Sequence, residues 1–249
     1  MTTRAKYNVG VQTFYEDTGY ETVQPMAPLF FRDDFVGPGK LVIPAAASDE
    51  SGMDWSKKIV GAGPPTVAGV ANAVGGQVAI TLEASSQKQD AVLYWDDQKA
   101  LDTTKGLVFE ARFQLSVLPS VAAVQAVIGV ASDWVDGPNN NTCFVTVGAT
   151  GSGALLLRSY DGVTTVSAAL SPALTLLTTS WAIVRIDFSD VTNVKIFVNG
   201  VQRTTAAQIV WAATSTLAVL QPYAAMYKAS GTGVGTMKVD YVKAWMNRA

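Results

Sequence analysis

The sequence predicts an all-β protein, a sandwich of two antiparallel sheets packed face to face. From Leu29 onward, short apolar runs alternate with Gly, Pro, Asn and Asp, as expected for strands joined by tight turns. No long segment repeats its apolar residues with the 3.6-residue period of an amphipathic helix, and only residues 120–130 and 165–178 could hold a short helical turn. We therefore expect one β domain over residues 27–249, after an arm over residues 1–26.

The arm differs in composition from the rest of the chain. Residues 1–26 are polar, lack sustained alternation and contain Tyr7, Tyr15 and Tyr20. Two interpretations stay open: an arm that becomes ordered against a neighbouring subunit, or an extended segment that lies on its own domain.

The clearest strands lie in WAIVRIDFSDVTNVKIFVNGVQ, which begins at Trp181. Apolar and polar residues alternate in both halves, as in strands with one buried face. Asn199-Gly200 suits a two-residue type I′ turn, because both central positions of that turn need a positive φ. The segment therefore predicts two linked hairpins. Further strands are expected over residues 30–36, 77–83, 91–95, 106–115, 124–131, 142–147, 154–160, 217–227 and 236–245.

Four pieces of the chain resemble a known superfamily. The segment from Trp181 to Gly200, W-x-x-V-R-I-D-F…V-K-I-F-V-N-G, resembles the paired strands of laminin G-like and other concanavalin A-like domains. FFRDDF at 30–35 resembles their opening strand, FEAR at 109–112 an F-E-A-R strand of some members, and MKVDYVKAW at 237–245 their closing strand. The resemblance implies a concanavalin A-like jelly roll.

Such domains occur in carbohydrate-binding modules, glycan hydrolases and phage virion proteins. The composition, rich in Ala, Val, Thr and Gly, and the polar arm are most similar to the phage proteins. Kinship of fold does not by itself assign a function.

Charge and hydropathy exclude several classes of partner. Charged residues make up only 15% of the chain and the formal charge is −2, so there is no basic field to hold nucleic acid. The N-terminus lacks the apolar core of a signal peptide, and no uninterrupted apolar run is long enough for a membrane span. The single Cys143 cannot form an intrachain disulfide and is expected to be buried. We expect a protein made in the host cytoplasm and located in a virion.

The residue types argue against catalysis. The chain has no histidine and one cysteine, which removes Ser-His triads, Cys-His dyads and the usual zinc sites. None of its five glutamates begins the E-x-D-x-x-E strand motif of glucanases in this superfamily. Glu110 is expected to pair with Arg112 on the same face of one strand. The sequence therefore predicts no catalytic residue, no bound cofactor and no enzymatic activity.

One segment, SDWVDGPNNN at residues 132–141, has the residue types of a ligand site. A sugar site combines an aromatic ring with amides and carboxylates, and the same oxygens could hold calcium. Exposed turns use these residues as well. The candidates for glycan or calcium contact are Asp133, Trp134, Asp136, Asn139, Asn140 and Asn141.

Two functions are consistent with these observations. The first is a non-enzymatic structural protein of a virus particle, a phage head decoration protein. It would form a homo-oligomer, a trimer according to the resemblance, and dock on the major capsid protein partly through its arm. The alternative is a lectin-like adhesion module of a phage tail or surface fibre, which would bind a cell-surface glycan.

Overall fold

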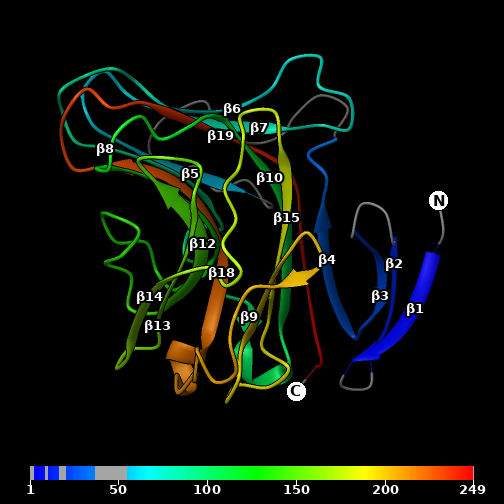
Figure 1. Cartoon of the computed structure of the whole chain (residues 1–249). Coiled ribbons are helices and arrows are strands. Elements are labelled where there is room, and N and C mark those ends of the chain that lie inside the picture. Colours follow the sequence, from blue (N-terminus) through cyan, green and yellow to red (C-terminus); the bar gives the residue numbers. More distant parts are fainter. Residues whose placement is uncertain (1–2, 9–10, 17–20, 37–54, 249) are drawn as a thin grey trace.

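The structure, a computed structural model, describes residues 3–8, 11–16, 21–36 and 55–248 and is shown in Figure 1. These residues form two eight-stranded sheets and one three-stranded sheet. Their only helical elements are two 3₁₀ turns, Thr103–Lys105 and Ser215–Ala218. The prediction of an all-β, two-sheet antiparallel sandwich is confirmed. Within the same ranges, no helix has the length and apolar character needed to cross a membrane.

The first large sheet, sheet 1, is antiparallel throughout its described pairings. Its strand order is β17 (Val201–Gln202), β16 (Lys195–Val198), β15 (Trp181–Asp187), β10 (Val108–Val117), β19 (Gly235–Met246), β7 (Val78–Leu82) and β6 (Thr66–Gly69), with β4 (Leu29–Asp33) also paired to β19.

The second large sheet, sheet 2, packs against sheet 1 and is likewise antiparallel. Its strand order is β14 (Thr165–Ala169), β13 (Leu155–Tyr160), β12 (Phe144–Thr150), β11 (Val124–Ala131), β18 (Val219–Lys228), β8 (Gln89–Tyr94) and β5 (Ser56–Val60), with β9 (Leu101–Asp102) paired to β18.

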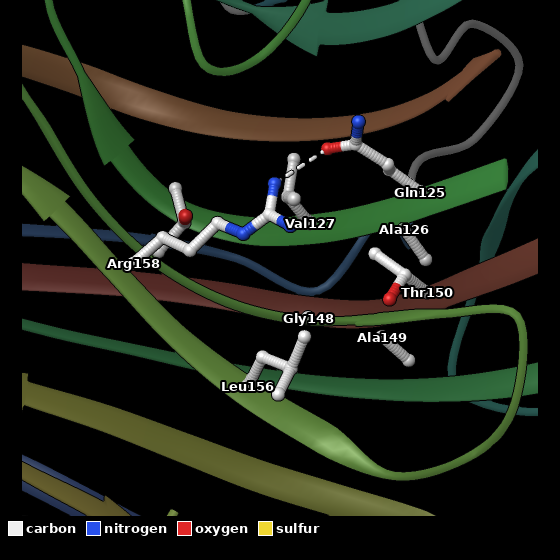
Figure 2. A pocket seen from close by; sticks show the side chains of 9 residues that line it. Gln125, Ala126, Val127, Gly148, Ala149, Thr150, Leu156 and Arg158 are labelled. Carbon is white, nitrogen blue, oxygen red and sulfur yellow. Dashed lines mark hydrogen bonds between the residues drawn. The ribbon is translucent and has the colours of Figure 1, made fainter. Parts of the chain in front are cut away.

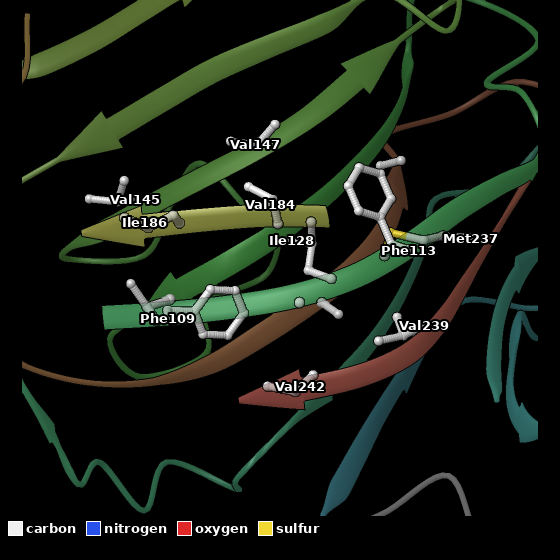
Figure 3. Close-up of a cluster of buried hydrophobic side chains, with 14 of the residues drawn as sticks. Phe109, Phe113, Ile128, Val145, Val147, Val184, Ile186, Met237, Val239 and Val242 are labelled. Atoms are coloured by element: carbon white, nitrogen blue, oxygen red, sulfur yellow. The ribbon is translucent and has the colours of Figure 1, made fainter. Parts of the chain in front are cut away.

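The hydrophobic core lies between the two sheets. Alternate residues of each strand point inward, so side chains from both sheets meet in one cluster (Figure 3). Representative members are Phe109, Phe113, Val184, Ile186, Val239, Ile128, Val145 and Val147. Cys143 is fully buried in this cluster, and burial raises the pKa of its thiol to about 11. The expectation of a buried cysteine is therefore confirmed.

The predicted hairpin turn is present, but the two segments that could have held a helical turn contain strands. Asn199 and Gly200 have φ values of 52° and 74°, so the type I′ hairpin between β16 and β17 is confirmed. Residues 120–130 and 165–178 contain strands β11 and β14 in place of helical turns. β11 is apolar on both faces because it lies between β12 and β18 with one face in the core.

A third, smaller sheet precedes the sandwich. It consists of β1 (Thr3–Asn8), β2 (Val11–Glu16) and β3 (Thr22–Met26) in that order, and Figure 1 shows it beside β4. We call it the arm sheet.

The arm sheet is joined to the outer face of sheet 1 by hydrogen bonds that Glu21 and Thr22 make with Glu110 and Lys243. The backbone N and Oγ1 of Thr22 donate to Glu110, over 3.0 and 2.6 Å. Lys243 Nζ donates to a carboxylate oxygen of Glu21 and to Thr22 O. The expected pairing of Glu110 with Arg112 is wrong: Thr22 covers Glu110, which is fully buried, and Arg112 pairs with Asp240.

Candidate functional site

The outer face of sheet 2, which points away from the core, carries a second apolar cluster. Its buried members come from four neighbouring strands and include Val92, Tyr94, Val127, Phe144 and Tyr223, with Trp134 and Tyr160 packed against them. A sheet face open to water does not normally gather so many large apolar side chains. Residues 132–141, the segment with ligand-like residue types, supply part of the cover, and we call them the site loop.

The acidic residues of the site loop are engaged with lysines. Asp133 pairs with Lys99 over 2.9 Å, and Asp136 pairs with Lys88. All four side chains are about a quarter to a half exposed, so these ion pairs are of the surface type and hold the loop weakly.

Trp134 lies against the sheet and points its indole nitrogen at a buried carboxyl. Its Nε1 donates to Asp90 Oδ2 over 3.3 Å, and Gly137 N donates to the same oxygen over 3.2 Å. Burial raises the pKa of Asp90 to about 7; these two hydrogen bonds oppose the rise and the nearby charge of Asp136 adds to it. Sequence reasoning missed Asp90, because nothing in its strand marks it as a residue beneath a loop.

The three asparagines of the site loop have different roles. Asn139 Nδ2 donates to Gln125 Oε1 over 2.9 Å, which ties the loop to β11. Asn140 donates to the backbone oxygen of Asp136, and Asn141 Oδ1 accepts from Val135 N, so both stabilise the loop itself. Of the predicted glycan or calcium residues, Asn139 also lines a hollow of the surface.

That hollow is a groove of about 580 Å³ beside the site loop. Its walls combine two aromatic rings with amide, hydroxyl and guanidinium groups. The lining residues are Asn139, Phe144, Arg158, Tyr160, Val163, Thr165, Val166 and Ser167. The rings of Phe144 and Tyr160 lie 6.4 Å apart at an angle of 51°. The groove thus offers apolar and hydrogen-bonding surface side by side.

Arg158 also lines a second, narrow hollow over β11 and β12 (Figure 2). Its side chain reaches across β12, and Nη1 donates to Gln125 Oε1 over 2.8 Å. Beneath this hollow stands Gly148, where a Cβ would lie 1.8 Å from the carbonyl oxygen of Ala126. The close approach of β11 and β12 therefore requires glycine, and it leaves the floor bare.

Metal ligands are not concentrated anywhere in the described ranges. No group of three or more His, Cys, Asp or Glu side chains that could hold a metal ion is found there. Calcium binding by the site loop stays a prediction.

Comparisons with known proteins give a fold but no family. No family model matches the chain, and no curated protein matches it. Solved structures do. A prokaryotic β-1,3-1,4-glucanase (lichenase) from a mouse hindgut metagenome is 12% identical with a TM-score of 0.56, over 87% of this chain and 99% of that one. An endo-β-galactosidase from Clostridium perfringens is 10% identical with a TM-score of 0.54, over 86% of this chain and 62% of that one. The carbohydrate recognition domain of Emp47p is 10% identical with a TM-score of 0.51, over 83% of this chain and 93% of that one.

The expected concanavalin A-like jelly-roll sandwich is therefore confirmed as the fold. The prediction that the chain is not an enzyme is contradicted, because the lichenase and the endo-β-galactosidase are enzymes on this fold. That prediction considered only carboxylates that lie close together in the sequence, on a single strand. The fold instead brings Asp90 of β8 beside Asp136 of the site loop, two carboxyl groups separated by 46 positions in the sequence. At 10–12% identity the likeness establishes the fold and transfers no reaction to this chain.

Proposed function

We propose that this protein binds a saccharide in the groove beside the site loop, on the outer face of sheet 2. The observation that supports this is the lining of the groove. Tyr160, supported by the buried Phe144, provides ring surface for the apolar face of a sugar, and Asn139, Thr165 and Ser167 provide partners for hydroxyl groups. The site loop forms one wall, and its hydrogen bond from Asn139 to Gln125 sets the position of that wall.

The first test is a glycan array with the full chain, with and without added calcium, followed by calorimetry on the oligosaccharides it retains. Tyr160→Ala should weaken binding at least tenfold, since stacking on the ring is lost. Trp181→Ala, on the outer face of sheet 1, is the matched control and should bind as the parent does. An array without hits in either condition contradicts the proposal.

Binding and cleavage need separate readouts, because both occur on this fold. The retained oligosaccharide is incubated with the protein and its chain length is measured by mass spectrometry. If the protein shortens the oligosaccharide and the Asp90→Asn variant does not, the carboxyl group of Asp90 takes part in cleavage. An unchanged oligosaccharide leaves binding as the activity.

A second function, attachment to a virus particle, is supported by the arm sheet. Among the described residues its three strands pair only with one another, and hydrogen bonds at Glu21 and Thr22, where β3 begins, join the arm sheet to sheet 1. A sheet of three short strands is marginal in water unless one face is covered. We propose that a neighbouring copy of the chain or a capsid protein provides that cover, so that the groove is presented on a virion surface. Light scattering coupled to size exclusion should find a homo-oligomer, a trimer by our expectation. A monomer at all concentrations contradicts cover by a neighbouring copy.

A further inference from the structure

The groove has one charged residue among its described lining residues, Arg158. The other residues that line it and the adjoining narrow hollow are neutral. No carboxylate of the described residues lies within ion-pair distance of its guanidinium, whereas Arg32, Arg112, Lys88, Lys99 and Lys243 each have such a partner. A positive charge without a carboxylate partner in a groove attracts an anionic group on a ligand.

Arg158 is also held in place. Its backbone belongs to β13, between β12 and β14, and its Nη1 donates to Gln125 Oε1 on the far side of β12. The same oxygen accepts from Asn139 of the site loop, over 2.9 Å. Gln125 therefore fixes one nitrogen of the guanidinium, and the remaining N–H groups of the fork are available to a bidentate acceptor.

The surroundings strengthen such a contact. Arg158 is half-buried between Gln125, Leu156 and Tyr160, and burial lowers the pKa of its guanidinium, although arginine stays protonated at neutral pH. Fewer water molecules then compete for its N–H groups than at an exposed arginine, so an incoming anion is screened less.

We propose that the saccharide bound in this groove is acidic and that Arg158 binds its carboxylate or sulfate group. This inference rests on the proposed function, since it specifies the ligand of the same groove. Carboxylate and sulfate share the geometry that a guanidinium fork accepts, so the ligand class is an acidic saccharide, uronate-bearing or sulfated.

The test compares three probes by calorimetry: a neutral galacto-oligosaccharide, an oligogalacturonate and a sulfated galacto-oligosaccharide of matched length. The full chain should bind one or both acidic probes at least tenfold more tightly than the neutral one. That preference should shrink as sodium chloride is raised, because salt screens the charge contact. The stronger of the two acidic probes identifies the anionic group.

The variants separate charge from shape. Arg158→Gln removes the charge and should lose the acidic preference, so that it binds the acidic and neutral probes with similar affinity. Arg158→Lys should retain part of the preference. Arg185→Gln is the matched control, since Arg185 is likewise a half-buried arginine in a strand but lies on sheet 1, over the ring of Phe197. Thermal melts of all three check that they fold.

Three outcomes count against the inference. Equal affinity of the full chain for neutral and acidic probes overturns it and leaves the proposed function standing. So does an Arg158→Gln variant that loses affinity for both classes to the same extent, because the arginine then only shapes the groove. Failure to bind any of the probes, together with an empty array, overturns the proposed function itself.

Discussion

The two large sheets each bury a carboxyl group on their outer face, but they surround it differently. On sheet 1, Glu110 accepts hydrogen bonds from Thr22 N, Thr22 Oγ1 and Tyr241 OH over 2.6 to 3.1 Å. On sheet 2, Asp90 accepts two longer ones, from Trp134 and Gly137, at 3.3 and 3.2 Å respectively, and its Oδ1 has no partner among the described residues.

The two covering segments are attached to their sheets in different ways. Glu21 and Thr22 both accept hydrogen bonds from the fully buried Lys243 of sheet 1, as expected for a permanent structural contact. The site loop is joined to sheet 2 by two long hydrogen bonds to Asp90, by shorter ones from Asn139 to Gln125 and from Gln221 to Ser132 O, and by two surface ion pairs. Several of these contacts are exposed to water, so the loop is held less tightly than Thr22 is held on sheet 1. We therefore expect substitutions at the first contact to change global stability more than substitutions at the second.

The largest effect is expected from Glu110→Leu. The leucine would leave Thr22 N, Thr22 Oγ1 and Tyr241 OH as buried donors without an acceptor, at a cost of about 3–5 kcal/mol of unfolding free energy. Denaturant unfolding measures the loss. Gln114→Leu, further along β10 on the same face, is the control and should change stability by less than about 1 kcal/mol.

A comparable loss in both variants would mean that apolar substitution on this face is costly in itself. The hydrogen bonds to Glu110 would then not explain a difference in stability between the two contacts.

The next effect is a pH dependence that arises from Asp90. The folded protein keeps this proton up to a pH of about 7, and the unfolded chain releases it near its ordinary value of 3.8. Stability should therefore fall as pH rises from about 4 to 7 and stay lower above that range. Asp90→Asn removes this charge at every pH and should flatten the profile, with a gain on the order of 2–4 kcal/mol above pH 7.

Thermal melts of the two proteins across this pH range provide the measurement. Asp102→Asn, whose carboxylate caps a 3₁₀ turn at the surface, serves as the control and should leave the profile of the parent unchanged. Parallel profiles for the parent and Asp90→Asn would contradict the burial of a protonated carboxyl under the site loop.

Much of the sandwich could be predicted from the sequence, because its strands carry an intrinsic pattern. Alternation over β15 and β16 and the Asn199-Gly200 turn determine a hairpin locally, and apolar runs mark the central strands β11 and β18. The pattern does not predict β5 or β6. β5 reads SKKIV, with two lysines in an edge strand of five residues, so neither length nor alternation distinguishes it from a loop.

The site could be predicted only where a single segment carries it. The composition of residues 132–141 predicts a ligand site there, and the site loop does lie beside the groove. Arg158 and Tyr160, by contrast, sit in an ordinary alternating strand, LLLRSY, and become groove residues only because β13 lies beside β12. Their role depends on pairing between strands, which the sequence does not encode locally.

A smaller effect is expected at the arm contact itself. Thr22→Val removes the hydroxyl that donates to Glu110 but keeps the shape of the side chain and the backbone donor, so it should cost about 1.5 kcal/mol. Thr22→Ser keeps the hydroxyl and should cost less than half of that. If the two substitutions are equally costly, packing of the threonine methyl group, and not the hydrogen bond, stabilises this contact.

The smallest effect on global stability, and the sharpest test of the comparison, is expected from Lys99→Gln. The side chain of Asp133 is about half exposed, so the lost ion pair should change unfolding by less than about 1 kcal/mol. Amide hydrogen exchange should nevertheless become faster in residues 132–141, because one of the contacts that hold the loop in place is lost. Lys238→Gln, on sheet 1, should leave that exchange unchanged. If exchange in the loop does not respond, the site loop is fixed as firmly as Thr22, and a saccharide must enter a groove that is already formed.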